Sequence, residues 1–148
     1  MDPFNLPAAA DRVLDEFFSI SKRLNIPSFL LYGTCLGFYR DGGYIDGDND
    51  LDVGSIGDVP ALVGALIKAD FLLVAVVSTN VHFLKHGILL DLYFNFPSVE
   101  YFQAFDKFNY KNKPYNFPSP LEDFLVSEYG DWKTKSSAQA STPCPKDG

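Results

Sequence analysis

Residues 32–55 read YGTCLGFYRDGGYIDGDNDLDVGS, and this stretch decides which fold the chain can adopt. Its second half has an aspartate at every second position: Asp46, Asp48, Asp50 and Asp52. Alternate residues of a β-strand point to the same face, so a strand over 50–53 carries two carboxylates on one face and two apolar side chains on the other. Close carboxylates repel each other unless a cation lies between them. Asp50 and Asp52 are therefore candidate ligands of a divalent cation, and a solvated acidic loop is the competing interpretation.

The first half of the stretch supplies groups that suit a phosphate. Gly33 and Thr34 follow an apolar run and are predicted to begin a short helix, whose free backbone N–H groups attract phosphate. An ordinary strand-to-helix turn needs glycine as well. Arg40 has a guanidinium suited to two-point contact with a phosphate, or to a surface ion pair with a neighbouring aspartate. Asp48 is expected to support the cation or a substrate hydroxyl, unless it is a solvated loop acid.

Further candidates lie in the β-rich segment downstream. Asp91 stands between leucines in a strand that should be buried, where a charge is costly unless a metal or a partner offsets it. It is a candidate third ligand or the general base that deprotonates an acceptor hydroxyl, although a strand-end aspartate bonded to backbone would look the same. Lys85 is a candidate for neutralising a phosphate, or an exposed strand lysine. His82 has no partner at a metal-ligand spacing and is expected to be structural.

Composition and net charge narrow the number of domains, the class of partner and the cellular location that we expect. At 148 residues the chain suits a single domain, expected at 1–133, with a disordered polar tail at 134–148. The net charge is -7 and no Lys/Arg-rich run occurs, which argues against a nucleic-acid partner. The start lacks the features of a secretory signal, the apolar run at 71–77 is too short to span a bilayer, and the two cysteines fit reduced thiols. We therefore expect a cytoplasmic protein without direct membrane insertion.

Hydrophobic periodicity predicts an α+β domain with a mixed or antiparallel sheet and helices mainly on one face. Helices are expected at 7–25, 34–39, 59–69 and 120–129, the last with Ser119 as its N-cap, and strands at 28–32, 49–53, 71–78, 81–85 and 88–94. The last three strands are separated by two-residue turns and are predicted to form a meander. Residues 96–117 show no regular pattern, and their dense aromatic side chains suit either a packed core or a cage for a quaternary ammonium group.

Several features of the opening stretch also occur together, in a fixed order. They are a Tyr-Gly-Thr turn, a Leu-Gly pair, an arginine, a Gly-Gly turn and an aspartate-rich run: Tyr32-Gly33-Thr34, Leu36-Gly37, Arg40, Gly42-Gly43 and Asp48–Asp52. Two more features follow, an aspartate in the apolar strand Leu90–Tyr93 and a terminal Tyr129–Trp132. Over residues 28–133 this order closely resembles the LicD/fukutin family of phosphotransferases, within the nucleotidyltransferase-fold superfamily. The resemblance implies a nucleotidyltransferase-like mixed β-sheet with helices packed mainly on one face.

The resemblance also implies an activity, namely that of a Mg²⁺-dependent phosphotransferase, with Mn²⁺ as an alternative cofactor. Such an enzyme moves a substituted phosphate, of phosphocholine or phospho-alditol type, from a CDP-linked donor to a glycan or small hydroxyl acceptor. Metal binding and catalysis would fall to Asp50, Asp52 and Asp91, and substrate phosphates to Gly33, Thr34, Arg40, Asp48 and Lys85. Two alternatives stay open: a nucleotidyltransferase that uses a nucleoside triphosphate to modify a protein or small molecule, and a catalytically weak nucleotide-binding or scaffold subunit. The oligomeric state also stays open.

Overall fold

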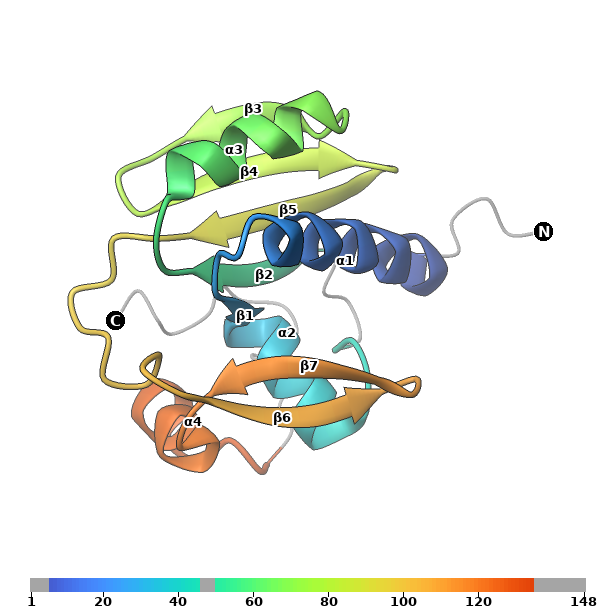
Figure 1. The fold of residues 1–148 in the computed structure, drawn as a ribbon. Helices are drawn as coiled ribbons and strands as arrows, with labels where there is room; N and C mark the ends of the chain where they lie inside the picture. Colours follow the sequence, from blue (N-terminus) through green and yellow to red (C-terminus); the bar gives the residue numbers. More distant parts are fainter. Residues whose placement is uncertain (1–5, 46–49, 135–148) are drawn as a thin grey trace. The chain divides into compact units, whose positions relative to one another are not determined.

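The computed structural model describes residues 6–45 and 50–134, and its contacts divide the chain into two compact units. The first unit comprises residues 1–28 and 49–96, and the second comprises residues 29–48 and 97–148. The elements in chain order are α1 (Leu6–Arg23), β1 (Ser28–Leu30), α2 (Tyr32–Leu36), the π-helix η1 (Gly37–Asp41), β2 (Asp50–Ser55), α3 (Val59–Lys68), β3 (Leu72–Val76), β4 (Asn80–Lys85), β5 (Ile88–Tyr93), β6 (Phe105–Tyr110), β7 (Lys113–Pro118) and α4 (Leu121–Tyr129) (Figure 1). The single domain predicted at 1–133 stays a prediction, and all of the predicted tail except Thr134 lies outside the described residues.

Within the described residues, five strands form a mixed sheet in the order β1-β2-β5-β4-β3. β2 runs parallel to β5, whereas β4 is antiparallel to both β5 and β3. The meander predicted for the last three strands is therefore present, and the predicted α+β fold with a mixed sheet is confirmed. β3 lies at the edge of the sheet, and all five of its apolar residues are exposed.

In the first unit, helices α1 and α3 lie over the same face of the sheet (Figure 1). α1 turns a fully buried stripe of Val13, Leu14 and Phe17 inward, with the spacing that one side of a helix requires. Asp58 precedes α3 as its N-cap, and its carboxylate accepts the backbone N–H of Ala61 at 3.1 Å. The helices predicted at 7–25 and 59–69 are therefore both present.

The second unit has a helical part and a hairpin. α2 continues directly into η1, and the π-helix ends at Gly42, whose φ of 78° is the left-handed conformation that glycine adopts without strain. Strands β6 and β7 form a two-stranded antiparallel sheet in the segment where no regular structure was predicted. Their turn places Lys111 and Asn112 at positive φ, as a two-residue hairpin turn requires.

Helix α4 begins differently from the prediction. Ser119 does not cap it, because its hydroxyl donates instead to the Asp106 carboxylate at 3.0 Å. The other oxygen of Asp106 accepts the backbone N–H of Leu121 at 2.9 Å. An aspartate on strand β6 therefore supplies the acceptor and the negative charge that a helix N-terminus favours.

Candidate active site

Three polar side chains lie next to one another on neighbouring strands of the first unit. In the parallel ladder Asp52 of β2 pairs with Asp91 of β5, and in the antiparallel ladder Asp91 pairs with His82 of β4. Paired residues point to the same face of a sheet, and adjacent strands lie about 4.8 Å apart. The acids that the sequence singled out on two separate strands are therefore brought side by side.

We call the face of the sheet that carries Asp52, Asp91 and His82 the acid face. It is opposite to the face that α1 and α3 cover. Leu51 and Val53, the residues that alternate with the acids, are 2% and 0% exposed and belong to the apolar core. Asp52 and Asp91 are themselves buried, each with 7% exposure. A buried carboxylate is costly without compensation, and two adjacent ones repel each other as well. Such a pair is the arrangement expected where a cation is to be held.

Asp50 occupies the first position of β2, two residues before Asp52, and so belongs to the acid face by alternation. It is half-buried and pairs with Leu89 rather than with an acid. Among residues 6–45 and 50–134, no group of three or more His, Cys, Asp or Glu is arranged as a metal site. The structure therefore brings Asp52 and Asp91 together as a pair. Asp48, like Asp46, lies outside the described residues.

His82 has contacts that its spacing in the sequence did not reveal. Its Nδ1 lies 2.5 Å from Oδ1 of Asp91, and its Nε2 lies 3.0 Å from Nδ2 of Asn80. Asn80 is 7% exposed, and its side-chain oxygen accepts the Thr79 hydroxyl at 3.2 Å. The sequence predicted a structural role for His82. The signal available in the sequence was that residues 80 and 82 alternate on one strand. Both side chains therefore lie on the face of the sheet that carries Asp91.

Lys85 is not brought to the acid face. It is three residues from His82 on β4, so alternation turns it to the helix-covered side. There its ammonium group donates to the Ala69 carbonyl at 2.7 Å and lies 3.5 Å from the Glu16 carboxylate. His86 Nε2 contacts the same carboxylate at 2.8 Å. Burial acts to raise the pKa of Glu16, but the His86 hydrogen bond and the Lys85 charge outweigh it and leave that pKa below its ordinary value.

The predicted phosphate turn lies in the second unit. Gly33 and Thr34 occupy the first turn of α2, and the helix's first backbone bond runs from Cys35 N–H to Leu31 C=O at 3.2 Å. N–H groups in a first turn have no partner within the helix, and phosphate binding by this turn stays a prediction. Thr34 is 2% exposed. Burial raises the pKa of the Cys35 thiol well above its ordinary value, so this cysteine is not an activated nucleophile.

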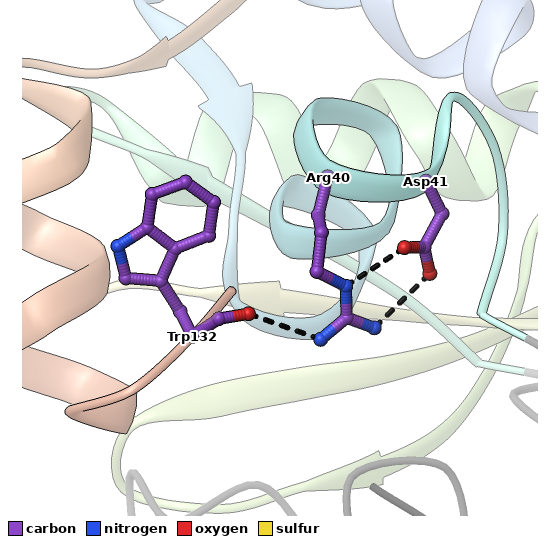
Figure 2. Close-up of polar contacts among 3 residues, drawn as sticks. All are labelled: Arg40, Asp41 and Trp132. Atoms are coloured by element: carbon purple, nitrogen blue, oxygen red, sulfur yellow. Dashed lines mark hydrogen bonds and ion pairs between the residues drawn. The ribbon is translucent and has the colours of Figure 1, made fainter. Parts of the chain in front are cut away.

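Arg40 forms the ion pair that was the alternative to a phosphate contact. Its Nε and Nη2 donate to the two carboxylate oxygens of Asp41 at 2.7 and 3.0 Å, and Nη1 donates to the Trp132 carbonyl at 3.1 Å (Figure 2). The side chain is only 7% exposed. These hydrogen bonds of Arg40 connect the end of η1 to the segment that follows α4.

Aromatic side chains fill the interior of the second unit. Phe29 stacks on Phe102 with ring centroids 4.6 Å apart, and Phe38 stacks on Tyr110 at 4.1 Å. Tyr101 packs edge-on against Phe124 at 5.6 Å. The rings considered for an ammonium cage therefore pack against other rings, as the core interpretation expects.

Comparisons with known proteins identify a family and similar folds. The family model described as LicD/FKTN/FKRP, nucleotidyltransferase domain, matches residues 25–128. The solution structure of the antibiotic-resistance factor ANT(2'')-Ia is similar with a TM-score of 0.64 and 12% identity, covering 90% of this chain and 83% of that one. The crystal structure of ANT(2'')-Ia with adenylyl-2''-tobramycin gives 0.59 and 13%, covering 78% and 74%. No match was found among curated proteins, and no helix within the described ranges is long and apolar enough to cross a membrane.

Proposed function

The chain belongs to the LicD/FKTN/FKRP nucleotidyltransferase-domain family, and from this premise we propose that it is a metal-dependent phosphotransferase. Its donor would be a CDP-linked compound that carries a substituted phosphate, of phosphocholine or phospho-alditol type. Its acceptor would be a hydroxyl group of a glycan or a small molecule. The observation that carries the proposal is the buried pair Asp52 and Asp91, side by side on parallel strands.

The donor groups on the acid face suit Mg²⁺ or Mn²⁺. Both ions prefer oxygen ligands, and Mg²⁺ in phosphoryl-transfer sites is commonly held by one or two carboxylates together with substrate phosphates. Asp52 and Asp91 would hold the ion, with Asp50 from the same face as a further ligand. When bound, the metal would supply positive charge that offsets the negative charge developing on the phosphoryl group in the transition state.

The remaining roles belong to Asp91 and to other residues of the family motif. Asp91 would accept the proton of the acceptor hydroxyl as that oxygen attacks phosphorus. The bond from phosphorus to the CMP oxygen would break, so that the substituted phosphate joins the acceptor and CMP leaves. The first-turn N–H groups at Gly33 and Thr34 would hold donor phosphates. Arg40 and Asp48 would assist, Arg40 after release from its ion pair.

A product assay tests this function directly. The purified protein with Mg²⁺, CDP-choline and a panel of hydroxyl acceptors should release CMP at a rate that depends on the acceptor. Asp52→Asn should reduce that rate by at least about 100-fold, the scale of one essential electrostatic contact. Asp70→Asn is the matched control, because Asp70 lies at a φ of 67° that asparagine also tolerates. CMP release at the same rate from Asp52→Asn would rule out the assigned site.

A second function is favoured by the structural neighbours. ANT(2'')-Ia has been crystallised with adenylyl-2''-tobramycin. In this chain the same acid pair would serve transfer of a nucleotidyl group from a nucleoside triphosphate to a small hydroxyl compound. That reaction releases pyrophosphate instead of CMP, so the identity of the released product separates the two. A protein that binds donors in the presence of Mg²⁺ and releases neither product would be a nucleotide-binding subunit.

A further inference from the structure

We propose that the edge strand β3 pairs with β3 of a second copy of this chain, so that the two sheets form one continuous sheet. β3 is the last strand in the order β1-β2-β5-β4-β3, and among the described residues it pairs with β4 alone. Within those residues, the backbone groups along its outer side therefore have no strand to bind. This inference concerns the surface of the first unit and does not depend on the proposed activity.

The sequence of β3 suits a strand in the middle of a sheet. Residues 71–77 read FLLVAVV, and residues 71–79 contain no charged side chain. Continuous apolar runs are typical of strands that are covered on both faces, whereas open edge strands are commonly protected by lysine or proline. The side chains of β3 are nonetheless exposed, by 58% at Leu72, 47% at Val74 and 66% at Val76. β3 thus combines the composition of a covered strand with an uncovered position.

Helix α3 extends the same apolar surface. The carbonyls at its end accept the N–H groups of Asp70 and Phe71, so the helix leads directly into β3. A helix that is apolar on all sides is normally buried on all sides. Apart from Lys68, the exposed residues of α3 are apolar or small: Pro60, Ala61, Gly64 and Ile67. Large exposed apolar surfaces mark interaction sites, and we call the outer edge of β3 with the exposed side of α3 the β3 surface.

A second copy fits the backbone, the charge and the area of the β3 surface. A two-fold axis makes two identical edge strands antiparallel and keeps both α3 helices on one face of the joined sheet. The net charge of -7 makes two copies repel each other, and the uncharged β3 lets them approach without placing like charges together. A specific interface buries roughly 1,000 Å² or more in total, and the exposed sides of both helices add to the area that the strands bury.

Two neighbouring amides of the strand report on this pairing. Val77 N–H donates to the Asn80 carbonyl at 2.9 Å, and the next pair along the ladder is Val76 with Val81. Adjacent pairs of an antiparallel ladder alternate between hydrogen-bonded and non-hydrogen-bonded. The N–H of Val76 therefore points away from β4, toward the open edge. The register shift of β3 lies earlier, between Leu73 and Ala75, so it leaves this end of the strand regular.

Analytical ultracentrifugation of the purified chain tests the proposal. Wild type should change from monomer to dimer as its concentration rises, and should form nothing larger because each copy has one β3 edge. Val76→Lys should raise the dissociation constant by at least about 100-fold, since it brings like charges to one seam. Val126→Lys, at a valine 56% exposed on α4, is the matched control and should dimerise like wild type. A wild type that stays monomeric, or a dimer that Val76→Lys leaves unchanged, would overturn the proposal.

Residue-resolved amide hydrogen exchange identifies the strand that pairs. The Val77 amide should be protected in monomer and dimer alike, whereas exchange at Val76 should slow by at least about 10-fold as the dimer forms. Protection of Val76 at every concentration, including those where the chain is monomeric, would show that another segment of the same chain covers the edge. A dimer in which Val76 stays unprotected would place the contact elsewhere. Either result would overturn the pairing of β3.

Discussion

Asp106 allows a quantitative test of how the second unit is held together. Its carboxylate accepts the Ser119 hydroxyl and the Leu121 backbone N–H, so β6 caps α4. Asp106→Ala removes both acceptors and the charge. We expect a loss of about 2 kcal/mol in unfolding free energy, the upper end of the range for a helix cap, because one carboxylate serves two donors.

Asp106→Asn separates the two contributions. The amide oxygen can still accept from Leu121 N–H, and the amide nitrogen can donate to the Ser119 hydroxyl, so only the charge is lost. Charge at a helix N-terminus contributes about 0.3–1 kcal/mol, and we expect Asn to cost that amount. Urea unfolding followed by circular dichroism measures both, with Lys107→Ala on the exposed side of β6 as control. Equal losses for Ala and Asn, or none for Ala, would refute the capping role.

Two further predictions concern packing and pH. A Cβ on Gly37 would lie 2.5 Å from the Gly43 carbonyl oxygen, so Gly37→Ala should cost about 1–3 kcal/mol of unfolding free energy. Gly64→Ala, in open space on α3, should instead be neutral or stabilise by up to about 1 kcal/mol in the same urea assay; the reverse order would contradict the close approach. The lowered pKa of Glu16 means that its contribution is present above the ordinary value of 4.5 and is lost as pH falls through the folded value. Glu16→Gln should therefore lower the unfolding free energy at neutral pH, where His86 and Lys85 contact the carboxylate, and should match wild type in acid. A difference in unfolding free energy that grows toward low pH would contradict this prediction.

Much of the first unit could be predicted from sequence because its patterns are local. The apolar period of α1 and the alternation of acids with Leu51 and Val53 each specify a face. The hairpin β6–β7 was missed for physical reasons. Its turn uses Lys111 and Asn112 at positive φ without a glycine, and β7 contains two prolines, which are tolerated because a two-stranded sheet has only edge strands.

Two residues of the candidate site could also be predicted from a local sequence pattern. Asp52 and Asp91 each stood out as a charge in an apolar strand, and the parallel ladder between β2 and β5 places them together. The roles of His82 and Lys85 could not be read from the sequence, because strand register decides which face each side chain occupies. A shift of one residue in β4 would exchange them, bringing Lys85 toward the acids and His82 toward the core.

The measurement closest to the central claim is the melting temperature of wild type and Asp52→Asn, each with and without Mg²⁺. Asp52→Asn removes one of the two carboxylates that would hold the ion, so Mg²⁺ should act differently on the two proteins. Mg²⁺ should raise the melting temperature of wild type, since a ligand at 100 times its Kd adds about 2.7 kcal/mol, and should leave Asp52→Asn unchanged. An equal rise in both proteins would show that Asp52 does not hold the metal.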